Sequence, residues 1–119
     1  MKRGDIWTVA GGGDYAGKAR PAVILQDDRF DMTDSVTICV FTTDVTEAPY
    51  IRLVIEPSEA NGLRQVSRLM VDKITTIRKS RLGVRIGHLS DDDILRLNSG
   101  LLFFLGIAGP TVARRQARR

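Results

Sequence analysis

The sequence is poor in side chains that bind metals, with one cysteine and one histidine in 119 residues. A zinc site made only of protein ligands is therefore not expected. Cys39 lies inside the apolar run 36–41, which favours a packed thiol over a nucleophile or a ligand. Long hydrophobic runs are also missing: no stretch approaches the roughly 20 apolar residues of a membrane span, and no hydrophobic signal region opens the sequence. We expect a soluble, cytoplasmic protein with no metal and no cofactor.

Acidic side chains are nearly absent from residues 64–85, where seven basic residues accompany a single acid, Asp72. Residues 1–20 carry four basic and two acidic side chains, and residues 21–63 carry two basic and eight acidic ones. The two basic blocks can form one face for a polyanion, or their charges can point in different directions.

We expect residues 1–109 to form one domain. Residues 110–119 read as a disordered basic tail that adds non-specific attraction to nucleic acid.

Short apolar segments between polar connections predict a mainly β protein. The predicted strands cover residues 6–9, 22–26, 36–41, 51–55 and 67–71, the last with an alternative end at 77. Ser90 followed by three aspartates predicts a helix N-cap. Apolar residues then recur at helical spacing from Ile94 to Leu105, before Gly106 and Pro110 stop the helix. The pattern indicates a small antiparallel β-barrel or strongly curved sheet, with a C-terminal amphipathic helix that closes the core or supports an oligomer contact.

A glycine-rich segment around Lys18 resembles a phosphate-binding P-loop, but the comparison fails at two points. Ala19 stands where the motif requires a magnesium-binding Ser or Thr. A P-loop also opens a helix, whereas Pro21 disfavours the α region for the residue before it and the following residues favour a strand. We therefore reject nucleotide binding here and expect Arg20 at a strand entrance.

Several short motifs, taken in order, resemble those of the MazF/PemK toxins from residue 2 through the predicted helix. These motifs are RGDIWTV at 3–9, KARPAVILQDDRF at 18–30, VFTTD at 40–44, NGL at 61–63, SRLMVDKITTI at 67–77 and RLGVRIGHLS at 81–90. The resemblance implies a small SH3-like β-barrel and a homodimer. It also implies a metal-independent endoribonuclease of a toxin–antitoxin pair, which cuts single-stranded RNA at short sequences.

Two residues are candidates for the active centre that the resemblance implies. Metal-independent RNA cleavage uses the neighbouring 2′-hydroxyl as nucleophile, so the protein must orient the phosphate, stabilise its charge and move protons. Arg20 can grip two phosphate oxygens with its planar guanidinium, and it matches the catalytic arginine of the family's RP motif. Thr42 matches the family's active-site threonine, and its hydroxyl can donate to a phosphate oxygen; Thr43 carries the same group. The alternatives are a structural ion pair for Arg20 and a turn-capping role for Thr42.

The proton-transfer partner is expected to be Asp72, by resemblance to an aspartate near the scissile phosphate in some relatives. This role requires a raised pKa, whereas pairing with surrounding cations would lower the pKa and make Asp72 an ion-pair partner. Many relatives carry a glutamate in the loop before the RP motif, but Asp14 and Tyr15 stand there in this sequence. Lys73 replaces a frequent glutamine, and Arg68 is a candidate to replace a functional arginine that one branch carries two residues later.

RNA binding is expected to involve Lys18, which can steer phosphate, and Tyr15, which can stack on a base, as well as Thr43, Arg68 and Lys73. The resemblance and the basic blocks also predict a cognate acidic antitoxin. Two other functions stay open. Related toxins of the same fold inhibit a protein target, DNA gyrase, without catalysis. The chain can also be a module that binds RNA without cutting it, since the loop before the RP motif lacks the glutamate of many relatives.

Overall fold

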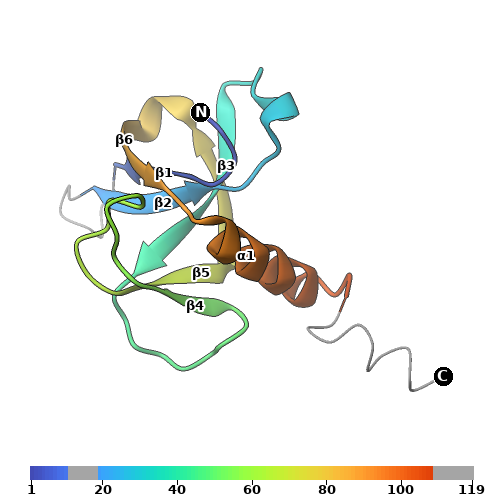
Figure 1. The fold of residues 1–119 in the computed structure, drawn as a ribbon. Helices are drawn as coiled ribbons and strands as arrows, with labels where there is room; N and C mark the ends of the chain where they lie inside the picture. The colour runs from blue at the N-terminus through green and yellow to red at the C-terminus, as the bar shows by residue number, and fades with distance from the viewer. Residues whose placement is uncertain (11–18, 109–119) are drawn as a thin grey trace.

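The computed structural model describes residues 1–10 and 19–108, and Figure 1 shows their path. Within these ranges the strands are β1 (Asp5–Val9), β2 (Arg20–Ile24), β3 (Ser35–Thr42), β4 (Arg52–Ile55), β5 (Ser67–Arg78) and β6 (Leu82–His88). Two short 3-10 helices, η2 (Asp28–Phe30) and η3 (Lys79–Arg81), join strands, and helix α1 spans Asp91–Phe104. The expected tail at 110–119 and most of the loop between β1 and β2 lie outside the described residues.

The strands form one antiparallel sheet in the order β4-β5-β3-β2-β1-β6. Together with helix α1, which follows β6 in the chain, this sheet confirms the predicted mainly β fold. All five predicted strands are present, and β5 runs to Arg78, which confirms the longer alternative for that strand. The sequence pattern does not predict β6, which pairs with β1 at the sheet edge.

The core has two parts, one on each face of the sheet. Along β2, Val23 packs in the larger cluster with Leu97 of α1, whereas Ala22 and Ile24 pack in the smaller cluster. Successive side chains of a strand point to opposite faces, so a strand buried on both faces needs an unbroken apolar run. This double burial explains why residues 22–25 lack the polar alternation of a half-exposed strand.

Helix α1 begins and ends where the sequence predicts. The Ser90 hydroxyl accepts a hydrogen bond from the backbone N–H of Asp93 at 3.1 Å, which is the expected N-cap. Gly106 ends the helix with a φ of 75°, and the N–H of Ile107 donates to the Leu102 carbonyl at 2.9 Å. This pattern is a Schellman motif, which glycine favours because it adopts positive φ without steric cost. Pro110 lies outside the described residues.

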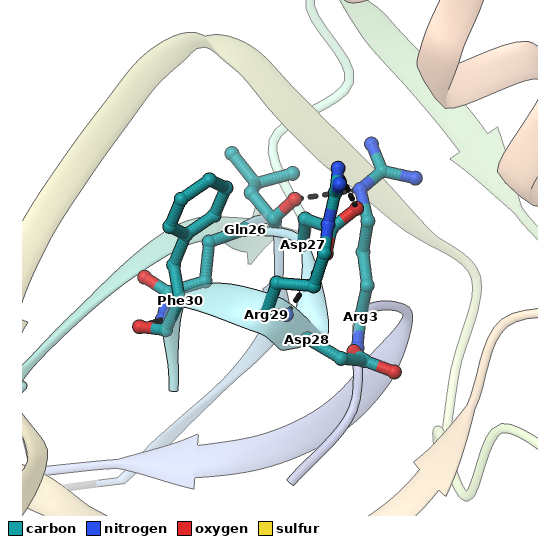
Figure 2. Close-up of polar contacts among 7 residues, drawn as sticks. Arg3, Gln26, Asp27, Asp28, Arg29 and Phe30 are labelled. Atoms are coloured by element: carbon teal, nitrogen blue, oxygen red, sulfur yellow. Dashed lines mark hydrogen bonds and ion pairs between the residues drawn. The ribbon is translucent and has the colours of Figure 1, made fainter. Parts of the chain in front are cut away.

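The connection between β2 and β3 is held by its own charged side chains and by Arg3 of the N-terminal segment (Figure 2). Arg29 forms an ion pair with Asp27 at 3.0 Å, and the Asp28 carboxylate accepts from the backbone N–H of Arg3 at 2.7 Å. The Arg3 guanidinium also donates to the Leu25 carbonyl at 2.6 Å. These bonds tie the acidic connection to the N-terminal segment, so its charges serve the local structure.

A β-bulge interrupts the pairing between β3 and β5. Cys39 lies opposite Ile74, but the next registered pair is Phe41 with Leu69. Val40 is therefore the only β3 residue across from residues 70–73 of β5. Bulges break the regular alternation of a strand and re-aim its side chains, and this one lies beside the entrance of β2.

Candidate active site

Arg20 and Thr42 lie at neighbouring strand ends. Arg20 is the first residue of β2 and pairs with Val9 of β1. On its other side β2 pairs with β3, with Ala22 opposite Val40. Continuing that antiparallel register by two residues sets Arg20 across from Thr42, the last residue of β3. The sheet thus brings together two residues that are 22 positions apart in the sequence.

A cavity of about 480 Å³ opens at this position and is lined by Arg20, Thr42 and Thr43. It has the volume of a small-molecule site. The other polar side chains along its wall come from β1, from the connection before β5 and from the start of β5: Thr8, Arg64, Gln65 and Ser67. No carboxylate of the described residues lines it. Two guanidiniums and several hydroxyls, with no acid among the described lining residues, form a site suited to an anion such as phosphate.

The Thr42 hydroxyl already has one partner, the backbone N–H of Asp44, which donates to it at 3.1 Å. This bond matches the turn-capping role considered as an alternative for Thr42. The two roles are compatible, because the oxygen acts as the acceptor and the hydroxyl hydrogen remains able to donate to a phosphate oxygen.

Residues 62–65 form another part of the wall of this cavity and overlap the family motif NGL at 61–63. Asn61 is 4% exposed, and its side chain holds the turn at residues 58–63: its carbonyl oxygen accepts from the N–H groups of Ser58 and Leu63 at 2.9 and 3.0 Å. Arg64 and Gln65 follow at once, and the prediction missed both as candidate site residues. Their position in the basic block 64–85 was the only signal that could have indicated them.

A second cavity, of about 290 Å³, also has Arg20 in its wall. Lys73 of β5 and Arg81 of η3 line it, together with the Thr75 hydroxyl and apolar side chains from β1, β3 and β5. The structure therefore places the predicted RNA-binding residue Lys73 near Arg20, although in a different cavity from Thr42 and Thr43.

Asp72 lines neither cavity. Its carboxylate binds the Arg52 guanidinium through two hydrogen bonds of 2.8 and 3.1 Å, and the two side chains are 23% and 13% exposed. The hydrogen bond from Arg52 lowers the pKa of Asp72 below its ordinary value of 3.8. The raised pKa that a general base needs is therefore absent here, and the ion-pair alternative is the one that the geometry favours.

Arg68 also lies outside both cavities. It pairs with Thr42 in the sheet, but its guanidinium donates to the Asp44 carbonyl at 3.3 Å and to Glu47 at 3.4 Å. Its side chain thus holds the connection after β3 in the described structure. The two remaining predicted RNA-binding residues, Tyr15 and Lys18, lie outside the described residues.

Cys39 is completely buried, and this burial raises the pKa of its thiol to about 12. Its packing confirms the prediction of a buried thiol. In the part of the chain that the structure describes, no three His, Cys, Asp or Glu side chains are grouped so that they could hold a metal ion. Within the same part, no helix has the length and apolar character needed to span a membrane.

The comparisons with known proteins agree on one family. Residues 2–105 match the model of the PemK-like, MazF-like toxins of type II toxin–antitoxin systems. The chain is 55% identical over 109 residues to a protein of Mycolicibacterium smegmatis named as a probable endoribonuclease MazF, covering 92% of this chain and 100% of that relative.

Solved structures show the same fold. A mycobacterial endoribonuclease in complex with its cognate antitoxin aligns with a TM-score of 0.76 at 22% identity, over 92% of this chain and 99% of that one. The toxin MazF-mt6 of Mycobacterium tuberculosis aligns with a TM-score of 0.72 at 25% identity, over 86% and 96% of the two chains.

Proposed function

The chain belongs to the PemK-like, MazF-like toxins of type II toxin–antitoxin systems, a family of endoribonucleases, and we propose that it cuts single-stranded RNA, such as mRNA, at specific sequences without a metal ion. Arg20 and Thr42 hold the phosphate of the bond that is cut. The observation that carries this assignment is the cavity of about 480 Å³ that both residues line and that no described carboxylate enters.

The reaction proceeds by attack of the 2′-hydroxyl oxygen on the adjacent phosphorus atom. The bond from phosphorus to the 5′-oxygen of the next nucleotide breaks, which gives a 2′,3′-cyclic phosphate and a 5′-hydroxyl end. The nucleophile loses its proton and the leaving oxygen gains one. Negative charge grows on the phosphate oxygens in the transition state, where the Arg20 guanidinium and the Thr42 hydroxyl stabilise it.

The described part of the larger cavity is suited to charge stabilisation rather than to proton transfer. Neither a carboxylate nor an imidazole of residues 1–10 and 19–108 lines it. Arg64 adds a second positive charge to the same wall and extends the surface that a nucleic-acid strand can follow.

The decisive experiment compares wild type and Arg20→Ala on a mixed pool of single-stranded RNA in EDTA, with the ends of the products sequenced. We expect wild type to leave cyclic-phosphate and 5′-hydroxyl ends, and Arg20→Ala to be slower by about 10²- to 10³-fold. Circular dichroism establishes that both proteins are folded. Folded, antitoxin-free wild type that leaves the pool intact would overturn the nuclease assignment. If Arg20→Ala cuts no RNA but still stops the growth of cells that produce it, the protein is instead an inhibitor of a protein target.

The partners follow from the same family. One relative of known structure is bound to its cognate antitoxin, and an acidic antitoxin segment is suited to the cations around the larger cavity. A second copy of this chain is the other partner, because Phe103 and Phe104 of α1 and Leu105 at its C-cap are each at least 40% exposed. Light scattering on the purified chain tests the homodimer, and a monomer at micromolar concentration would contradict it.

A further inference from the structure

The smaller cavity combines an apolar floor with a cationic rim. Ile38 and Val9, which are 1% and 5% exposed, form part of the floor, while Lys73 and Arg81 stand at the rim with Arg20. No described carboxylate lines this cavity. Apolar surface next to positive charge is the combination that a nucleotide requires, because a base has apolar faces and its phosphate is an anion.

The β-bulge of β5 builds this cavity. Its backbone groups are satisfied locally: the Cys39 thiol donates to the Met70 carbonyl at 3.0 Å, and the Val71 N–H donates to the Ile51 carbonyl at 2.9 Å. Met70 and Lys73 line the same cavity although they are three residues apart, whereas in a regular strand such residues point to opposite faces. The bulge is thus a stable feature that turns Lys73 toward the apolar floor.

Described acids do not neutralise the charges of Lys73 and Arg81 at the rim. The neighbouring acid in the sequence, Asp72, is bound by Arg52. Lys73 makes no ion pair or side-chain hydrogen bond with the described residues, and Arg81 donates to a neutral acceptor, the Ala10 carbonyl, at 2.7 Å. An incoming phosphate would therefore reach Lys73 and Arg81 without first displacing a carboxylate of the described residues.

We propose that the smaller cavity binds the nucleotide adjacent to the bond that is cut, with its base on the apolar floor and its phosphate at Lys73 and Arg81. The assignment rests on the proposed function, in which Arg20 holds the scissile phosphate. Because Arg20 lies in the walls of both cavities, a strand that passes it places one phosphate in the larger cavity and the next nucleotide in the smaller one. The Thr75 hydroxyl gives this second site a group that can donate to or accept from the base or ribose.

The test neutralises one phosphate of the substrate and one cation of the protein, separately and together. Short oligonucleotides carry a single ribonucleotide at the mapped cleavage site, and a neutral methylphosphonate replaces the phosphate on either side of the scissile one. For wild type, we expect the methylphosphonate at one of these two positions to lower kcat/KM by about 10-fold, the scale of a hydrogen bond to a charged group. In Lys73→Ala the same replacement should cost less than about 3-fold, because one of the two cations that bind this phosphate is already gone.

Two controls make the result specific. Lys73→Arg keeps the charge and should recover the sensitivity to methylphosphonate. Arg78→Ala removes an exposed cation of the same strand that lines neither cavity, and it should behave as wild type. Lys73 is exposed and without described hydrogen bonds, so its replacement should leave the melting temperature unchanged.

The outcomes separate this proposal from the nuclease assignment. Equal losses in wild type and Lys73→Ala at both phosphate positions would overturn the second site while leaving the nuclease intact. Wild type that cuts none of the oligonucleotides, nor the RNA from which the site was mapped, would overturn the nuclease assignment itself.

Discussion

The ion pair between Arg52 and Asp72 predicts that Asp72→Asn lowers stability much more than it lowers RNA cleavage. The pair has two hydrogen bonds, and its side chains are 13% and 23% exposed. Breaking a buried pair costs about 3–5 kcal/mol, because one charge is left without its partner. An exposed pair contributes only about 0.2–1 kcal/mol. Since this pair lies between the two limits, we expect the free energy of unfolding to fall by about 1–3 kcal/mol.

The pH dependence of this loss has a definite sign. The hydrogen bond from Arg52 lowers the pKa of Asp72 in the folded state. The stabilisation is therefore fully present above the unfolded-state pKa of about 4. It is lost as the pH falls through the folded-state pKa. The difference in stability between wild type and Asp72→Asn should be largest near neutral pH and should shrink below about pH 4.

Denaturant unfolding at fixed protein concentration measures the stability, and cleavage of an RNA oligonucleotide by the folded protein measures activity. Asp31→Asn is the matched control, since Lys79 binds Asp31 at 2.9 Å but that carboxylate is 42% exposed. Its loss should stay below about 1 kcal/mol. We expect cleavage by Asp72→Asn within about 3-fold of wild type, a small loss beside that of a group acting in proton transfer. Unchanged stability with a loss of activity of 100-fold or more would refute the structural interpretation and establish acid–base catalysis by Asp72.

Two further predictions concern the buried thiol of Cys39 and the closely packed Gly62. Because burial raises the pKa of the Cys39 thiol to about 12, a disulfide reagent at pH 8 should leave the native protein unmodified and react only after unfolding; reaction at the rate of a free thiol would contradict this. Gly62 has a φ of 69°, and an added Cβ would lie 2.1 Å from the Ile86 carbonyl oxygen, so Gly62→Ala should cost more than about 2 kcal/mol in denaturant unfolding. Gly106→Ala, with a φ of 75° but nothing within 4 Å, should cost only about 1 kcal/mol, and equal losses would show that the contact with Ile86 is unimportant.

The strands and the helix could be predicted because their signals are local. The N-cap at Ser90 and the glycine that ends α1 specify its limits within the helix itself. The strand β6 could not be predicted in this way, because glycine has low strand propensity. Gly87 is nevertheless required there: a Cβ at this position would lie 2.3 Å from the carbonyl oxygen of Ala60. That close contact joins residues far apart in the sequence and leaves no periodic signal.

The candidate site was predictable only where a motif was continuous in the sequence. Arg20 beside Pro21 and Thr42 at a strand end are such cases, and the structure brings them to one cavity. Arg64 reaches the same cavity from a turn that is held by the side chain of Asn61, a contact visible only in three dimensions. The partner of Asp72 is likewise set by strand pairing with β4, 20 residues away.

The least predictable feature is the bulge, yet it decides what β5 contributes to RNA binding. Strict alternation from Leu69 would put Val71 and Lys73 on one face of the strand. In the structure Val71 lies in the larger core cluster, whereas Lys73 lines the smaller cavity with Met70. The sequence holds one trace of this irregularity, three consecutive apolar residues at 69–71 that are all buried. A run of that kind in an otherwise alternating strand indicates a local change of face. The role of Lys73 therefore depends on the bulge, and a substitution that restored regular pairing should turn its charge away from Arg20.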